Sequence, residues 1–159
     1  MLTEYYARQT CVNGHIISNM LESANEASAK FCSKCGAETI INCPACNTPQ
    51  HGAIEGVVSM GSKVPDAFCH SCGKPYPWTN KQLEATSELV KEDEQLSDED
   101  KATLTKSLPD LMADTPSTAL AATRFKRIVG KAGPVFKAAM YKFIVDVSSS
   151  AAKKIVCGE

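Results

Sequence analysis

Eight cysteines and three histidines are the residues of this chain whose types and spacing could do chemistry. Seven of the cysteines and all of the histidines lie in the first 80 residues, where side chains able to bind a metal occur as four close pairs. The pairs are Cys11 with His15, Cys32 with Cys35, Cys43 with Cys46, and Cys69 with Cys72. A Cys-x-x-Cys pair on a tight turn can place two thiolates on one metal ion, and two pairs complete a tetrahedral zinc site. The four pairs therefore predict two zinc ions per chain.

An internal repeat indicates how the pairs combine. The motif Phe-Cys-x-x-Cys-Gly begins at Phe31 and recurs 37 residues later, beginning at Phe68. The second and fourth pairs are thus equivalent closing halves, each preceded by a different opening pair. We expect two successive zinc ribbons, with one site made by Cys11, His15, Cys32 and Cys35 and the other by Cys43, Cys46, Cys69 and Cys72. A cross-braced arrangement, which joins the first pair to the third and the second to the fourth, remains the alternative.

His15 is the least regular of these ligands, because three residues separate it from Cys11 where the other pairs have two. Without His15 the first site would have only three ligands, and a neutral imidazole binds zinc well. We therefore expect His15 to bind the metal. The alternative is a surface histidine, with His51 or a water molecule completing the site. An iron–sulfur cluster remains the alternative to zinc, because thiolates also bind iron.

The pattern of these residues does not predict catalysis. Each expected site has four protein ligands and therefore no open coordination position for a reacting water. The His-Glu-x-x-His motif of zinc peptidases is absent from the sequence. A thioredoxin-like centre has one Cys-x-x-Cys pair at a strand-to-helix junction, whereas this chain has three such pairs in a glycine-rich segment. We expect structural zinc, no catalytic residues and no enzymatic activity.

Several motifs of the first 80 residues together resemble a known family. They are Cys-x-Asn-Gly-His from Cys11, the two Phe-Cys-x-x-Cys-Gly copies, Cys-Pro-x-Cys from Cys43, and Pro-Tyr-Pro-Trp-Thr from Pro75. This combination is similar to a bacterial family of small double zinc-ribbon proteins of unknown function. The resemblance implies a bacterial, cytoplasmic protein that binds metal through the matched residues, and it implies no reaction.

The net charge of −1 hides a division of the chain. Residues 1–80 carry −1, residues 81–115 carry −6 and residues 116–159 carry +6. Cysteine and glycine are concentrated in the first part, whereas Leu, Ala, Lys and Glu recur at helical spacing in the rest. We expect a small metal-bound domain of tandem zinc ribbons over residues 1–79, followed by a short all-α domain of four helices over residues 80–159.

Caps and prolines predict where the four helices begin and end. The expected ranges are about 79–94, 97–109, 116–130 and 134–156. The first is expected to begin at a capping box opened by Thr79, and Pro109 is expected to end or bend the second. Pro116 and Pro134 suit the first positions of the third and fourth helices. We expect Trp78 to pack between the two halves of the chain.

The expected third helix carries a basic stripe, because Arg124, Arg127 and Lys131 recur at helical spacing opposite its apolar face. Such a stripe could bind phosphate groups or an acidic partner. The alternative is that it faces the chain's own acidic helices or water. The stripe is thus a candidate surface for a protein partner or a nucleic acid.

Two functions agree with these observations. The first is a zinc-binding adaptor, in which zinc makes the first half rigid and the helical half docks a protein partner or forms a homo-oligomer. The second is a nucleic-acid-binding zinc ribbon that uses the basic third helix. No run of about 18 uncharged apolar residues predicts a membrane span, and no motif predicts a small-molecule substrate. Cys157 lies outside both expected sites, and the sequence assigns it no role.

Overall fold

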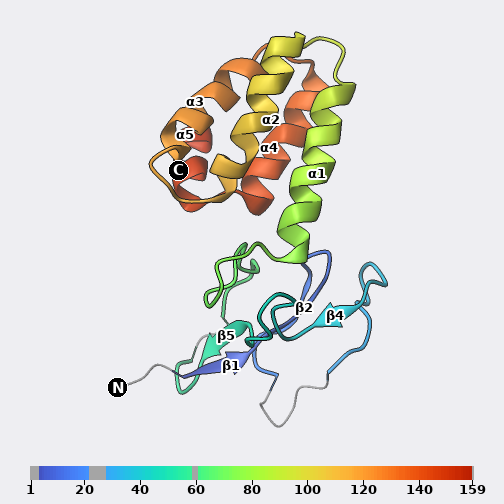
Figure 1. The fold of residues 1–159 in the computed structure, drawn as a ribbon, viewed down its shortest axis with the longest axis vertical. Helices are drawn as coiled ribbons and strands as arrows, with labels where there is room; N and C mark the ends of the chain where they lie inside the picture. Colours follow the sequence, from blue (N-terminus) through green and yellow to red (C-terminus); the bar gives the residue numbers. More distant parts are fainter. Residues whose placement is uncertain (1–3, 22–27, 59–60, 159) are drawn as a thin grey trace. The chain divides into compact units, whose positions relative to one another are not determined.

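The computed structural model describes residues 4–21, 28–58 and 61–158. The chain divides into two compact units, Met1–Asn80 and Lys81–Glu159, each of which is described by itself. The first is a small β unit and the second is helical (Figure 1). None of the helices in the described ranges combines the length and hydropathy that crossing a bilayer requires.

Short antiparallel strands form the N-terminal unit. Its elements are β1 (Tyr5–Ala7), β2 (Gln9–Cys11), β3 (Ile16–Ser18), β4 (Thr39–Ile40) and β5 (His51–Ile54). Strand β1 pairs with β5, and β2 is the central strand of a three-stranded sheet in the order β3-β2-β4. Strands of two to four residues cannot enclose a large apolar core. The sheets instead position the loops that carry the cysteines.

Much of the interior of this unit is polar. Arg8, Gln9, Thr10 and Gln50 are all buried. The Thr10 hydroxyl donates to the Gln50 side-chain carbonyl at 3.1 Å, and the Gln9 amide donates to the Ala29 carbonyl at 2.8 Å. Every fully buried side-chain nitrogen and oxygen of the described residues has a hydrogen-bond partner. These hydrogen bonds fix the loops in place, but their net contribution to the free energy of folding is smaller than that of apolar burial.

Trp78 belongs to a small apolar cluster of the N-terminal unit. Its ring stacks on Tyr76 with centroids 4.6 Å apart, and both rings pack with Cys43 and Cys69. The indole N–H donates to the carbonyl of Asp66 at 3.0 Å. We expected Trp78 between the two halves, whereas every contact described here lies within the first unit.

The described residues from 77 onward contain five helices, not the expected four. They are α1 (Pro77–Glu92), α2 (Asp98–Met112), α3 (Thr118–Val129), α4 (Pro134–Val147) and α5 (Ser150–Cys157). The first turn of α1 belongs to the N-terminal unit. The single helix expected over 134–156 is divided at Ser148 and Ser149, which both have extended backbones. The Ser149 hydroxyl accepts a hydrogen bond from the N–H of Ala152, so Ser149 is the N-cap of α5. It lies within a stretch whose apolar residues recur at helical spacing on both sides of it.

Other helix limits also differ from expectation. Pro116 lies in a turn and not in the first position of the third helix, because Ser117 is the N-cap and α3 begins at Thr118. Helix α1 begins at Pro77 rather than at Thr79. The Thr79 hydroxyl donates to the carbonyl of Ala67 at 2.7 Å, so it does not cap the helix. Helix α2 continues for three residues beyond Pro109. Leu111 and Met112 are buried there, and burying two large apolar side chains offsets the cost of a proline inside a helix.

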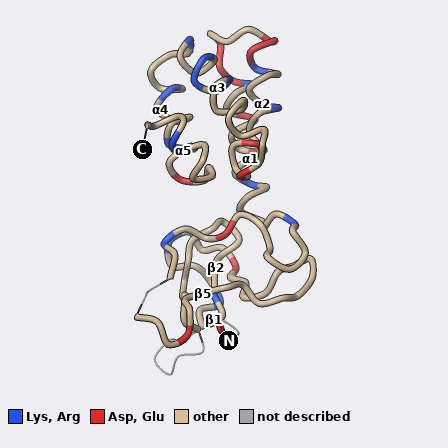
Figure 2. Tube along the Cα trace, turned by 90° about the vertical axis from the view of Figure 1, so that its left-hand side faces the viewer, with Lys and Arg blue, Asp and Glu red and all other residues tan. Residues whose placement is uncertain are grey.

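The helical unit has a continuous apolar core. Helix α3 supplies its centre, with Phe125 and Ile128 fully buried, and α4 adds Met140 and Ile144. The ring of Phe125 meets Tyr141 edge to face at 5.9 Å. Figure 2 colours the charged positions along the trace, and the acidic excess of residues 81–115 falls on α1, α2 and their connections. The apolar core of this unit contains none of the metal-ligating residues.

Candidate metal centres

The three Cys-x-x-Cys pairs lie on loops with the same backbone hydrogen bonds. The first cysteine of each loop donates its N–H to a carbonyl five residues later, at 2.8 Å for Cys32 and Cys43 and 2.9 Å for Cys69. Each of these cysteines also accepts from the N–H four residues later, at 2.8–2.9 Å. A single antiparallel bridge closes the loop at its base. This repeated geometry turns both thiols of a pair toward the same point.

Each loop requires one residue with a left-handed backbone. Gly36 and Gly73 supply it in the two repeated motifs, with φ of 69° and 70°. Asn47 supplies it in the remaining loop, with φ of 60°. Both glycines end the repeated Phe-Cys-x-x-Cys-Gly motif, whereas no prediction was made for Asn47. The signal was present, because asparagine adopts this conformation more readily than other residues that carry a side chain.

The opening pair of the first centre lies on the turn between β2 and β3. The N–H of Cys11 donates to the carbonyl of His15, and the N–H of Gly14 donates back to Cys11, both at 2.9 Å. Gly14 has φ of 92° and lies against Trp78, so that a Cβ at this position would be 3.1 Å from the Trp78 Cβ. The glycine therefore allows both the tight turn and the close approach of the indole.

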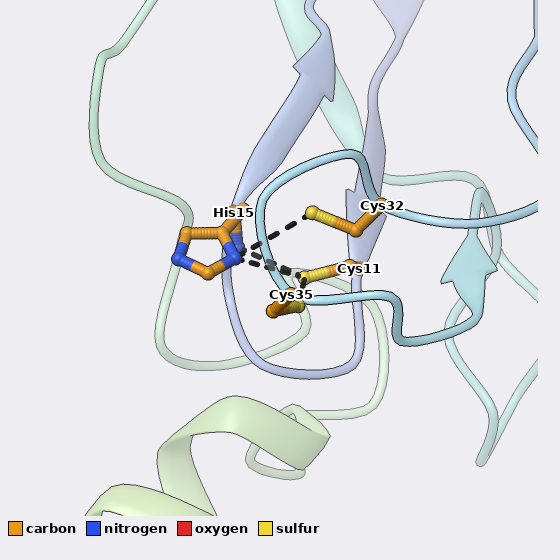
Figure 3. Close-up of side chains that lie close together, drawn as sticks. All are labelled: Cys11, His15, Cys32 and Cys35. Carbon is orange, nitrogen blue, oxygen red and sulfur yellow. Dashed lines mark hydrogen bonds between the residues drawn. The ribbon is translucent and has the colours of Figure 1, made fainter.

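Cys11, His15, Cys32 and Cys35 form the first centre, in which their ligand atoms all lie within 4.8 Å of one another. Figure 3 shows the four side chains converging from the β2–β3 turn and the loop at Cys32. His15 Nδ1 is 3.5 Å from Cys11 Sγ and 3.6 Å from Cys32 Sγ, and the thiols of Cys11 and Cys35 are 3.8 Å apart. A zinc tetrahedron with bonds of about 2.0–2.3 Å has S–S edges of about 3.8 Å and N–S edges of about 3.6 Å. The spacing fits one zinc ion.

The second centre contains the remaining four cysteines, again with all ligand atoms within 4.8 Å of one another. The thiols of Cys43 and Cys72 are 3.8 Å apart, and those of Cys46 and Cys69 are 3.7 Å apart. These distances also match the edges of a tetrahedral Zn–S₄ site. The structure thus joins the first pair to the second and the third to the fourth, in sequence order and not cross-braced.

Two of the exposed thiols are prepared for metal binding by their neighbours. The backbone N–H of Ala37 and then the Asn13 amide lower the pKa of Cys35 to about 6. The hydroxyl and then the N–H of Thr48 lower the pKa of Cys46 to about 6. Burial raises the pKa of Cys11. Zinc binds the thiolate form, so the lowered pKa values of Cys35 and Cys46 favour metal binding at both centres.

The other two histidines belong to neither centre. His51 stacks between Tyr5 and His70, with ring centroids 4.1 Å and 3.6 Å away. His70 is exposed, and its Nε2 lies 3.2 Å from the Pro49 carbonyl. Since His15 occupies the fourth position of the first centre, His51 is not needed to complete it. No pattern in the sequence predicts this stack of three rings.

The structure connects one end of the basic stripe to an acidic helix start. Lys131 Nζ lies 2.7 Å from the Asp100 carboxylate in the first turn of α2. This hydrogen bond is the main cause of the lowered pKa of Asp100, and Arg127 contributes a smaller attraction. Arg124 is half-buried. The stripe therefore faces, at least in part, acidic groups of the chain itself.

In the described residues, a small β unit with two Cys/His tetrads is followed by five helices, which defines a zinc-binding protein of two units. The model of a bacterial family, described as an uncharacterized protein conserved in bacteria (DUF2321), matches residues 4–156, and the chain belongs to this family. This match confirms the expected bacterial family of unknown function and extends it through the helical unit. No curated protein and no solved structure matches the chain significantly.

Proposed function

We propose that this protein is a zinc-stabilised adaptor. Two structural zinc ions hold the N-terminal unit, built as tandem zinc ribbons, in one conformation, and the helical unit docks a protein partner. The observation that carries the structural part is the pair of complete tetrads at tetrahedral spacing. Four protein ligands saturate a zinc ion and leave no position for a substrate.

The polar interior of the N-terminal unit supports a structural role for zinc. Its buried side chains include Arg8, Gln9 and Thr10, and its apolar cluster contains two of the ligands, Cys43 and Cys69. A unit with so little apolar burial needs another source of folding free energy. Zinc supplies it, because the metal binds the folded unit and not the separated loops.

Exposed apolar side chains of the helical unit support partner docking. Val135 is 84% exposed and Val145 is 57% exposed, both on α4. The core of the same unit is closed, so these valines are not unfilled core positions. Contiguous exposed apolar patches mark protein-binding surfaces, and Val135 lines the same surface hollow as Leu89, which is 37% exposed.

Partner capture tests this proposal with the zinc-loaded full chain. Chemical cross-linking followed by mass spectrometry should recover a defined protein, and a Val135→Arg/Val145→Arg variant should lose it. That variant should keep two zinc ions and an unchanged circular dichroism spectrum. Ala102→Arg, at an exposed position of α2, is the matched control and should keep the partner. Equal recovery by the double variant and the control would contradict the adaptor role.

Nucleic-acid binding is the competing function, and it makes a separate prediction. The pairing of Lys131 with Asp100 removes one of the three stripe charges, which weakens the case for a phosphate-binding face. Binding of fluorescent DNA and RNA across a salt series distinguishes the two functions. A steep salt slope that falls when Arg124, Arg127 and Lys131 are replaced by alanine would favour the nucleic-acid function over the adaptor.

A further inference from the structure

We propose that a groove between α1 and α4 binds a basic amphipathic helix of the partner. The apolar face of that helix would lie in the groove, with its Lys and Arg side chains against the acidic end. This inference rests on the proposed adaptor function, since it names the docking surface and the chemistry of the partner.

The groove consists of two adjoining hollows, both inside the helical unit. The larger holds about 390 Å³ and is lined by the end of α1, residues 92–95 and the start of α4. The smaller holds about 250 Å³ and lies between the middle of α1 and the second half of α4. Leu89 and Ala139 line both hollows, so the two form one continuous groove along the helix pair.

Small side chains keep the groove open. Ala85 on α1 and Ala139 on α4 line its middle part. Phe136 and Phe143 also line the hollows, and both are buried members of the apolar core. Leu89 is 37% exposed and the adjoining Val135 is much more exposed. Alanines allow close approach of another backbone, and exposed Leu and Val offer apolar contacts, which together suit a helix laid into the groove.

One end of the groove is strongly acidic. Glu92, Asp93 and Glu94 line the larger hollow, and no Lys or Arg lines it. Asp93 has a structural task, because its carboxylate accepts the N–H groups of Gln95 and Leu96 at 2.9 Å. Glu92 and Glu94 are exposed, and neither forms an ion pair within the described part of the chain. Their charges are therefore available to a cation.

The opposite end of the groove is electrically balanced. Lys142 and Asp146 line the smaller hollow and form an ion pair with each other across one turn of α4. A docking helix thus meets a net negative charge at one end only. This asymmetry favours a helix that carries its basic residues at one end, and it orients that helix along the groove.

The test uses the zinc-loaded full chain and a synthetic probe. The probe is a fluorescein-labelled peptide of about 18 residues with leucines on one helical face and four lysines at one end. A matched peptide carries glutamates in place of the lysines. At low salt, fluorescence polarisation should give a Kd of about 10 μM for the lysine peptide and at least about tenfold weaker binding for the glutamate peptide.

Variants locate the binding site. Leu89→Arg should weaken binding of the lysine peptide at least about tenfold, because it places a long cation in the groove. Glu92→Lys/Glu94→Lys should reverse the preference between the two peptides. Leu120→Arg replaces an exposed leucine of α3 that lines neither hollow, and it should bind like the wild type.

Three results would overturn the inference. They are equal binding of the two peptides, equal binding by Leu89→Arg and Leu120→Arg, and sedimentation of the chain as a dimer that Leu89→Arg dissociates. The last result would assign the groove to a second copy of the chain. A captured partner that Leu89→Arg retains would refute the groove while the adaptor function stands. Peptide binding in the groove without a captured partner would refute the adaptor function and leave the groove as a binding site.

Discussion

Removal of one ligand from the first centre is the most direct test of the zinc assignment. Cys32→Ser deletes a buried thiolate whose sulfur lies 3.6 Å from His15 Nδ1. The apparent free energy of structural zinc binding is about 10–16 kcal/mol. An equal share for each of four ligands is about 2.5–4 kcal/mol, or about 70- to 900-fold in zinc affinity. The variant should therefore release one zinc ion to a chelator that leaves the wild type with two.

The assay combines zinc counting with two spectroscopic signals that separate the units. Inductively coupled plasma mass spectrometry after chelator dialysis should count two zinc ions in the wild type and one in Cys32→Ser. The single tryptophan, Trp78, packs in the N-terminal unit, so its fluorescence should report the loss of order there. Far-ultraviolet circular dichroism should stay close to the wild type, because the helical core contains no ligand.

Cys157→Ser is the matched control, because this cysteine is exposed and belongs to neither tetrad. It should keep two zinc ions and unchanged tryptophan fluorescence. Two zinc ions of wild-type affinity in Cys32→Ser would show that Cys32 is not a ligand. Loss of a zinc ion in Cys157→Ser would show that the tetrads are wrongly assigned.

Three further predictions address backbone strain, electrostatics and close packing. Asn47→Ala should destabilise the N-terminal unit by about 1 kcal/mol, because alanine is strained at positive φ. Asn47→Gly should not destabilise it. The chelator concentration at which half of the zinc is lost measures the effect of each variant. Asp100 has a lowered pKa in the folded state, so its pair with Lys131 stabilises the helical unit above the ordinary pKa of 3.8. That contribution disappears as the pH falls through the lowered value, and the stability difference between wild type and Lys131→Ala in urea should vanish with it. Gly14→Ala should shift the wavelength of the Trp78 emission maximum and weaken zinc binding at the first centre, because the added methyl group meets the Trp78 side chain. An unchanged emission maximum would refute this contact.

The metal centres were the most predictable part of the protein. The repeated Phe-Cys-x-x-Cys-Gly motif indicated which pairs are equivalent, and the structure groups the same eight side chains in the same order. Ligand spacing is a local property, because each loop is closed by hydrogen bonds within six residues. The left-handed Asn47 was missed because asparagine is common in loops that do not require this conformation.

The helical limits were less predictable, because tertiary contacts decided them. Thr79 has the sequence signature of a cap, but its hydroxyl donates to Ala67, which lies 12 residues earlier. The division between α4 and α5 was hidden by an apolar period that runs through it. It depends on the Ser149 cap and on the hydrogen bond from the Ser149 N–H to the Leu111 carbonyl at 2.8 Å. No local sequence pattern predicts a hydrogen bond between residues as far apart in the chain as Ser149 and Leu111.

The polar interior of the N-terminal unit has a consequence for its response to temperature. The heat capacity change of unfolding grows with the apolar area that becomes exposed, and exposed polar area reduces it. Buried Arg8, Gln9 and Thr10 therefore give this unit a small heat capacity change, whereas the core around Phe125 gives the helical unit a large one. The stability of the helical unit should follow a strongly curved dome with temperature. The stability of the zinc-bound unit should change much less with temperature, and its magnitude should depend on the concentration of free zinc.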